Sequence, residues 1–176
     1  MRLFTAIDLP AQIVSSLSEF LDRVRPLAQL RWSPIANLHI TTKFIGEWPE
    51  AKLADMKRAL SKVKAAPCEI AIQRLGWFPN AKRPRVFWAG VEGGVPLMTL
   101  ARETEQAVSK LGVPIEKRDF SPHLTLARVE VPKGLDSLHR EAAANADREF
   151  GVFRATNFYL YLSAGGRYTK LADFPL

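Results

Sequence analysis

The chain has 176 residues, enough for one compact domain, and its apolar and charged fractions of 47% and 24% are typical of a globular protein and exclude a disordered one. The net charge of +7 favours anionic partners without specifying a fold. The single cysteine, Cys68, excludes an internal disulfide and a multi-cysteine metal site. No apolar run reaches the ~18 residues of a membrane span, so we expect a cytoplasmic protein with no membrane segment.

The first half of the chain predicts alternating strands and helices. Residues 2–8 indicate a strand, and Pro10 opens a helix that runs to about residue 28, with apolar residues at helical spacing. After a Ser-Pro turn, the alternating, β-branched run 38–44 indicates a second strand. Pro49 then starts a helix that ends before Pro67, and residues 68–75 indicate a third strand.

The second half repeats this order about 83 to 85 residues later. It predicts a strand at 85–91, a helix from Pro96 to Gly112, a strand at 120–129, a helix at 135–148 and a strand at 152–162. Gly165-Gly166 forms a tight turn into a final strand at 168–174. Because internal repeats decide architecture, we predict one bilobal domain spanning 1–176, with lobes at approximately 1–80 and 84–165 and a groove between them.

Two of the three histidines begin the same pattern at matching points of the repeat: His39-Ile40-Thr41-Thr42 and His123-Leu124-Thr125-Leu126. Side chains alternate along a strand, so each histidine shares a face with the threonine two residues later, roughly 6.5–7 Å away. A neutral imidazole can accept a proton from water while an imidazolium donates one to a leaving oxygen. Threonine hydroxyls can hydrogen-bond the non-bridging oxygens of a phosphodiester. The pattern therefore predicts acid–base catalysis by His39 and His123, with Thr41 and Thr125 binding phosphate.

The surroundings of the two motifs suggest no metal site and no cofactor. Neither His39 nor His123 has a carboxylate, cysteine or histidine at the usual ligand spacing, and there is no glycine-rich phosphate loop. Lys43 shares the face of His39 and Thr41 and is a candidate phosphate ligand, although a solvated lysine at a strand end fits equally well. Arg128 falls on the opposite face by simple alternation and reaches the phosphate only if the strand end twists.

Aromatic and cationic residues are mixed in the segment 77–85, a composition that suits base stacking and contacts to a nucleic-acid backbone. Packing of these aromatic side chains into the core is an equally compatible interpretation. Trp32, Phe120 and Tyr168 are weaker stacking candidates. His139 lies in a charged helical stretch and is predicted to be exposed and without a role.

The paired motifs resemble the two-histidine (2H) phosphoesterase superfamily and, within it, the RNA 2′,3′-cyclic phosphodiesterases, also called 2′-5′ RNA ligases. The resemblance covers nearly the whole chain, including the opening segment 2–10, the blocks 31–46 and 83–91, the block 122–128 around the second histidine, and the terminal segment 168–176. The combination is far more specific than either tetrapeptide alone.

The resemblance implies a bilobal α+β fold with antiparallel sheets around a central cleft and helices outside. It also implies metal-independent opening of 2′,3′-cyclic phosphates at RNA ends to 2′-phosphomonoesters. By the same resemblance, His39 would protonate the departing 3′ oxygen and His123 would activate water, a direction for which the near-symmetric halves give no reason of their own. The reverse reaction would join RNA ends through a 2′,5′ linkage, and no obligate protein partner is expected. The turn at 163–167 is shorter than the hairpin often found in the family, which leaves the preferred substrate length open.

Two other interpretations stay open at this point. One is a binding module that holds nucleotides or RNA without turnover, although pure binding does not need a matched pair of histidines. The other is a phosphodiesterase of the same fold that acts on a different cyclic phosphate, such as a cyclic nucleotide or an ADP-ribose cyclic phosphate. The basic surplus favours RNA only mildly.

Overall fold

The computed structural model describes residues 1–176 and contains two antiparallel sheets and four α-helices. The strands are β1 (Arg2–Asp8), β2 (Arg31–Trp32), β3 (His39–Glu47), β4 (Cys68–Phe78), β5 (Val86–Glu92), β6 (His123–Arg128), β7 (Glu149–Ala155), β8 (Asn157–Ala164) and β9 (Arg167–Pro175). The helices are α1 (Ala11–Val24), α2 (Leu53–Leu60), α3 (Gly94–Ser109) and α4 (Asp136–Ala144), with short 3-10 turns at Arg25–Leu27, Ile35–Asn37 and Glu50–Lys52. The predicted α+β class with antiparallel sheets is confirmed.

The two sheets exchange strands between the two halves of the repeat. One sheet has the order β3-β1-β8-β9 and the other the order β2-β6-β5-β4-β7. Strand β4 from the first half therefore pairs with β5, and β8 from the second half pairs with β1. Because the third strand of each half crosses over, the sheets do not coincide with the residue ranges 1–80 and 84–165 expected for the lobes.

The prediction of a single strand at 152–162 is wrong. This segment is divided between β7, which pairs with β4, and β8, which pairs with β1 and β9. Thr156 separates the two strands. An alternating apolar run reports only a half-buried strand and not which sheet covers its edges, so the crossover leaves no mark in the pattern.

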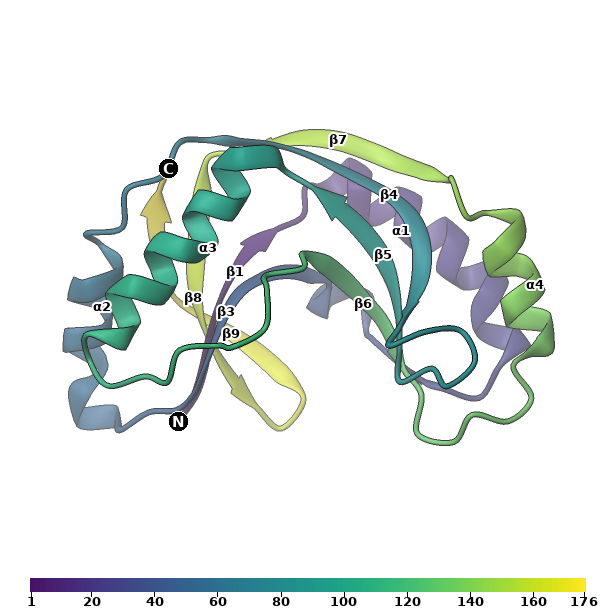
Figure 1. The fold of residues 1–176 in the computed structure, drawn as a ribbon, viewed down its shortest axis with the longest axis horizontal. Coiled ribbons are helices and arrows are strands. Elements are labelled where there is room, and N and C mark those ends of the chain that lie inside the picture. Colours follow the sequence, from purple (N-terminus) through teal and green to yellow (C-terminus); the bar gives the residue numbers. More distant parts are fainter.

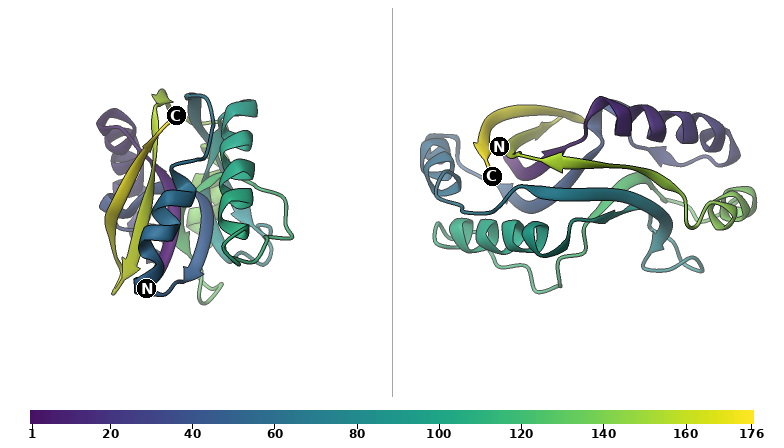
Figure 2. Two further views of the ribbon diagram at one scale, coloured as in Figure 1. Left: turned by 90° about the vertical axis from the view of Figure 1, so that its left-hand side faces the viewer. Right: turned by 90° about the horizontal axis from the view of Figure 1, so that it is seen from above.

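Helices lie on the outer sides of the sheets, and α1 and α3 each contact a strand of the sheet to which their preceding strand does not belong. Helix α1 follows β1 but packs against β7 of the other sheet, where the rings of Phe20 and Phe150 are 5.6 Å apart. Helix α3 follows β5 and packs both against β3 of the other sheet and against β4 of the same sheet. Figures 1 and 2 show α1 and α4 at one end of the molecule and α2 and α3 at the other. A single cluster of 38 buried residues joins the elements, and none of the helices is both long and apolar enough to cross a membrane.

Candidate active site

Strands β3 and β6, which carry the two histidine motifs, lie next to each other near the middle of the molecule (Figure 1). Each histidine is the first residue of its strand and is half-buried. In the ladder between β1 and β3, His39 lies opposite Asp8, whereas His123 lies opposite Gly90 in the ladder between β5 and β6. The two motifs are therefore similar in backbone position but differ in the residue across the strand.

Both imidazole rings are held by the same hydrogen bond. Nδ1 of His39 is 2.6 Å from the carbonyl oxygen of Asn37, and Nδ1 of His123 is 2.8 Å from the carbonyl oxygen of Ser121. A carbonyl can only accept, so each Nδ1 carries a proton and donates it. In both rings Nε2 is then the nitrogen that can accept or release a proton, and it has no hydrogen-bond partner within the protein.

The pKa values of both histidines are lowered, chiefly by burial. For His39, burial lowers the pKa, the hydrogen bond to Asn37 and the carboxylate of Asp8 raise it, and the charge of His123 lowers it. For His123, burial lowers the pKa, the hydrogen bond to Ser121 raises it, and the guanidinium of Arg128 lowers it. The imidazole of His39 therefore lies within electrostatic range of His123, and their charged neighbours have opposite signs.

The carboxylate of Asp8 belongs to a polar network that reaches across the first sheet. The hydroxyl of Tyr161 donates to Asp8 Oδ1 at 2.5 Å, and Nζ of Lys170 donates to Oδ2 at 2.7 Å. Burial and the adjacent carboxylate raise the pKa of Tyr161 far above its usual range. A pocket of about 360 Å³ opens against these groups and against His39, so this imidazole can be reached from solvent.

Aromatic rings pack around each histidine. The centroids of Phe4 and Tyr168 lie 4.8 Å and 5.1 Å from that of His39. The ring of Phe78 lies 4.9 Å from His123, with an edge-to-face angle of 84°. Aromatic neighbours displace water, which is the physical source of the desolvation that lowers both pKa values. Tyr168, predicted as a weaker stacking candidate, thus lies beside the histidine of the first motif.

A β-bulge at the same point of each motif decides which residues share the histidine face. In β3 the register passes from Thr41 to Lys43, so Thr42 is the extra residue, and in β6 it passes from Thr125 to Ala127, so Leu126 is extra. Two consecutive buried residues mark the bulge in each strand: 42 and 43 in β3, and 126 and 127 in β6. Directly beyond the bulge, at residues 43 and 44 of β3 and 127 and 128 of β6, the side chains lie on the face opposite to the one that simple alternation predicts.

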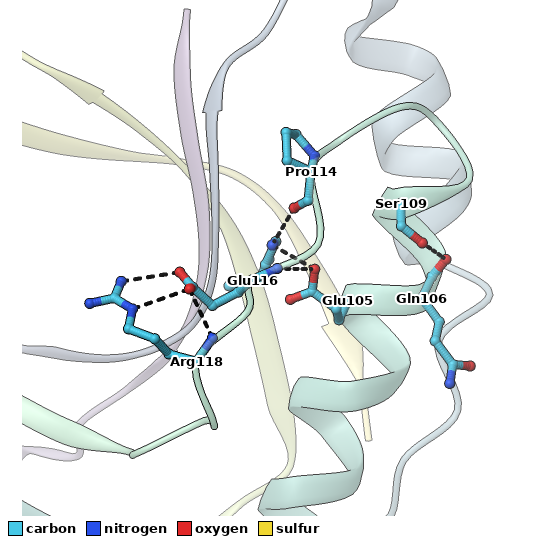
Figure 3. A network of polar contacts seen from close by, with 7 residues as sticks. Glu105, Gln106, Ser109, Pro114, Glu116 and Arg118 are labelled. Carbon is cyan, nitrogen blue, oxygen red and sulfur yellow. Dashed lines mark hydrogen bonds and ion pairs between the residues drawn. The ribbon is translucent and has the colours of Figure 1, made fainter.

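The bulge turns Lys43 away from the histidine face, so its predicted place beside His39 and Thr41 is wrong. Lys43 lies opposite Thr5, and its side chain is 7% exposed. Nζ donates to Glu105 Oε1 at 2.7 Å and to the carbonyl oxygen of Pro114 at 3.0 Å. Figure 3 shows the carboxylate of Glu105 turned toward the loop that carries Pro114. The ammonium group is thus held in a buried ion pair behind the sheet.

The equivalent bulge in β6 turns Arg128 toward the face of His123 and Thr125. Arg128 lies opposite Val86, two residues along β5 from Trp88, which itself lies opposite Thr125. Side chains two residues apart on a strand share a face, so Arg128 and Thr125 lie on the same side. Arg128 is exposed and forms no ion pair, which leaves its guanidinium available to an anion.

The aromatic residues at 77–85 divide between the core and the site. Trp77 packs between Phe87 at 4.5 Å and His139 at 4.6 Å, whereas Phe78 faces His123. The prediction that His139 is exposed is wrong, because its ring is half-buried edge-on against Trp77. The two weaker candidates Trp32 and Phe120 also pack inward against the hydrophobic core.

Several residues near the histidines were missed from the sequence. The sequence places Asp8 only at the end of the first predicted strand, and Tyr161 and Lys170 come from strands remote in sequence. The carbonyl partners Asn37 and Ser121 each lie two residues before a histidine, a shared spacing that could have signalled them. No group of three or more histidine, cysteine, aspartate or glutamate side chains is arranged to hold a metal ion.

Comparison with known sequences finds one family along most of the chain. The family model described as LigT like Phosphoesterase matches residues 7–88 and 92–168. An RNA 2′,3′-cyclic phosphodiesterase of Methanocaldococcus jannaschii is 33% identical over 163 residues, covering 93% of this chain and 91% of that protein. A protein of the same name from Methanothermobacter thermautotrophicus is 33% identical over 183 residues, covering 100% and 99% of the two chains.

Solved structures with the same architecture include members named as phosphoesterase or LigT. TT0787 of Thermus thermophilus superimposes with a TM-score of 0.82 and 31% identity, covering 100% of this chain and 98% of that one. LigT of E. coli, in a crystal structure complexed with 3′-AMP, superimposes with a TM-score of 0.79 and 26% identity, covering 99% and 97%. The overall architecture of this chain is thus found in other solved proteins.

Proposed function

Since this chain belongs to the LigT-like phosphoesterase family, we propose that it opens 2′,3′-cyclic phosphates at RNA ends to 2′-phosphomonoesters. It is a phosphoesterase and therefore a hydrolase, and its relatives named RNA 2′,3′-cyclic phosphodiesterase support this substrate. The observation that carries the proposal is the matched hydrogen bonding of His39 and His123, whose Nδ1 atoms are both occupied. Two Nε2 atoms are thereby left as a proton donor and a proton acceptor.

In the proposed reaction, Nε2 of His123 accepts a proton from water as the water oxygen attacks phosphorus. The bond between phosphorus and the 3′ oxygen breaks, and Nε2 of His39 donates its proton to that oxygen. The hydroxyls of Thr41 and Thr125 donate to the non-bridging oxygens, where negative charge accumulates, and Arg128 adds a positive charge beside them. No step in this scheme uses a metal ion. If an RNA 5′-hydroxyl attacks phosphorus in place of water, the same bond to the 3′ oxygen breaks and a 2′,5′ linkage forms.

The unequal surroundings of the two histidines support His39 as the acid and His123 as the base. The carboxylate of Asp8 raises the pKa of His39 and so favours its imidazolium form. The guanidinium of Arg128 lowers the pKa of His123 and so favours the neutral ring that can accept a proton. Gly90, opposite His123, offers no carboxylate equivalent to Asp8. The different charged neighbours of the two histidines thus support the same acid and base roles that the resemblance implies.

The proposal is tested by hydrolysis of a nucleoside 2′,3′-cyclic phosphate and of a short RNA ending in one. Replacing His39 or His123 with alanine should each lower kcat by about 10²–10⁴-fold, the usual contribution of a positioned acid or base. The product should be the 2′-phosphomonoester, identified by its chromatographic mobility. His139→Ala is a matched control. This third histidine lies on α4 and packs against Trp77, so its replacement should change kcat by no more than a small factor.

Each outcome separates the proposal from its alternatives. Wild type that binds RNA but cleaves neither substrate would mean a binding module. Hydrolysis of another cyclic phosphate in preference to both would change the substrate class but keep the two-histidine chemistry. We also propose that the protein acts in the cytoplasm, since its only cysteine is a buried free thiol and it needs no oxidising environment to fold.

A further inference from the structure

The loop between β4 and β5 presents cations that no carboxylate neutralises. Lys82, Arg83 and Arg85 are exposed, and none of them forms an ion pair. This contrasts with the arginines at 23, 58, 74, 102 and 118, each of which pairs with an acidic side chain. Unpaired cations gathered in a single loop raise the local affinity for polyanions.

The loop holds these cations in a defined conformation. Oδ1 of Asn80 accepts hydrogen bonds from the backbone N–H groups of Lys82 and Arg83, both at 3.0 Å. The N–H of Arg85 donates to the carbonyl of Phe78 at 2.7 Å and closes the loop, and Pro84 is buried beneath it. A loop fixed by its own backbone loses little further entropy when it binds a ligand.

The position of the loop connects it to the histidine pair. Phe78, the residue before the loop, has its ring 4.9 Å from that of His123. Val86, the residue after it, lies opposite Arg128, which in turn lies opposite Arg31 on β2. In Figure 1 the loop joins the ends of β4 and β5 beside the end of β6. A row of unpaired cations therefore runs from Arg128 to the tip of the loop, whereas Arg31 is paired with Glu130 at 3.9 Å.

We propose that the 79–85 loop binds the backbone phosphates of RNA nucleotides on the 5′ side of the cyclic phosphate. This inference rests on the proposed function, because only an RNA substrate has a further phosphate for each nucleotide beyond its reacting end. The cations carry no base-specific geometry, so the loop should bind RNA without regard to sequence. A nucleoside cyclic phosphate has no such phosphates and cannot use the loop.

The test compares two substrates across salt concentrations for the variant Lys82→Gln/Arg83→Gln/Arg85→Gln. The ratio of kcat/KM for an RNA oligonucleotide to that for the nucleoside cyclic phosphate should fall about tenfold or more at ~50 mM salt. The plot of log kcat/KM for RNA against log salt concentration should become shallower by about 0.7 for each phosphate that the variant no longer neutralises. Binding of labelled RNA in a His123→Ala background, followed by fluorescence anisotropy, separates affinity from turnover.

The variant Lys52→Gln/Lys62→Gln/Lys64→Gln removes the same charge from exposed positions beside α2, at the other end of the molecule (Figures 1 and 2). It should keep the wild-type substrate ratio and salt slope. An unchanged ratio in the loop variant, or an equal loss in the α2 variant, overturns the proposal. If wild type cleaves neither substrate, the proposed function fails instead. The anisotropy measurement then tests the loop proposal on its own. If the loop variant binds RNA as tightly as the protein with the native loop, the loop proposal is overturned.

Discussion

The buried ion pair of Lys43 gives a direct test of the bulge in β3. If the bulge places Lys43 behind the sheet, Lys43→Met should lower stability and leave catalysis nearly intact. The ammonium group is 2.7 Å from Glu105 Oε1 and 3.0 Å from the carbonyl of Pro114, and the side chains of Lys43 and Glu105 are 7% and 22% exposed. Its removal leaves a mostly buried carboxylate without its cation.

Removing one partner of a buried pair costs about 3–5 kcal/mol. The carboxylate of Glu105 keeps some solvent contact and a hydrogen bond from the N–H of Glu116 at 3.2 Å, so we expect the lower end, about 3 kcal/mol. For a chain of this size that corresponds to a fall in Tm of about 6–12 °C. The double variant Lys43→Met/Glu105→Leu removes both charges and should recover most of the lost stability.

Urea unfolding measures the free energy of unfolding for wild type and both variants, and kcat/KM is measured well below the lowest unfolding midpoint. We expect kcat/KM of Lys43→Met to stay within about threefold of wild type, because an interaction worth a tenfold change in rate needs about 1.4 kcal/mol of transition-state contact. A fall of about 100-fold in kcat/KM with unchanged stability would refute the reasoning and place Lys43 at the phosphate.

Three further outcomes are expected. Arg128→Gln removes a cation that lowers the pKa of His123, so the pKa of His123 should rise and the acid limb of the pH profile of kcat/KM should move to higher pH. An unmoved acid limb would argue against the proximity of Arg128 and His123. Activity should persist in the presence of a chelator, and loss that a divalent metal restores would contradict the metal-free scheme. Gly76→Ala would drive a Cβ into the rigid ring of Trp88, so it should lower the free energy of unfolding by about 1–3 kcal/mol. Urea unfolding measures this loss, and the fluorescence of tryptophan should change with it. Unchanged stability would contradict the close packing of Gly76 and Trp88.

Much of the fold could be predicted from periodicity and from the repeat. The strand at Arg2–Asp8 matches β1 residue for residue, and the predicted starts of β3, β4 and β5 lie within one residue of those observed. Apolar spacing and proline positions act locally, so they can be recognised without tertiary structure. The short strand β2 was missed, because two residues paired to the edge of β6 carry no periodic signal.

The paired tetrapeptides determined the candidate site in outline, because the period of two in a strand fixes which residue of each motif shares a face with its histidine. Only the tertiary structure decided the rest. The bulges at Thr42 and Leu126 are properties of the register with β1 and β5, and they turn Lys43 behind the sheet and Arg128 toward His123.

The exchange of strands and the unequal charges beside the two histidines depend in the same way on segments distant in sequence. Asp8 lies opposite His39 because β1 pairs with β3, and Gly90 takes the equivalent place opposite His123. A repeat makes the two halves look alike because it records local pattern. Pairing between distant strands, which local pattern does not encode, is what makes the two histidines chemically different.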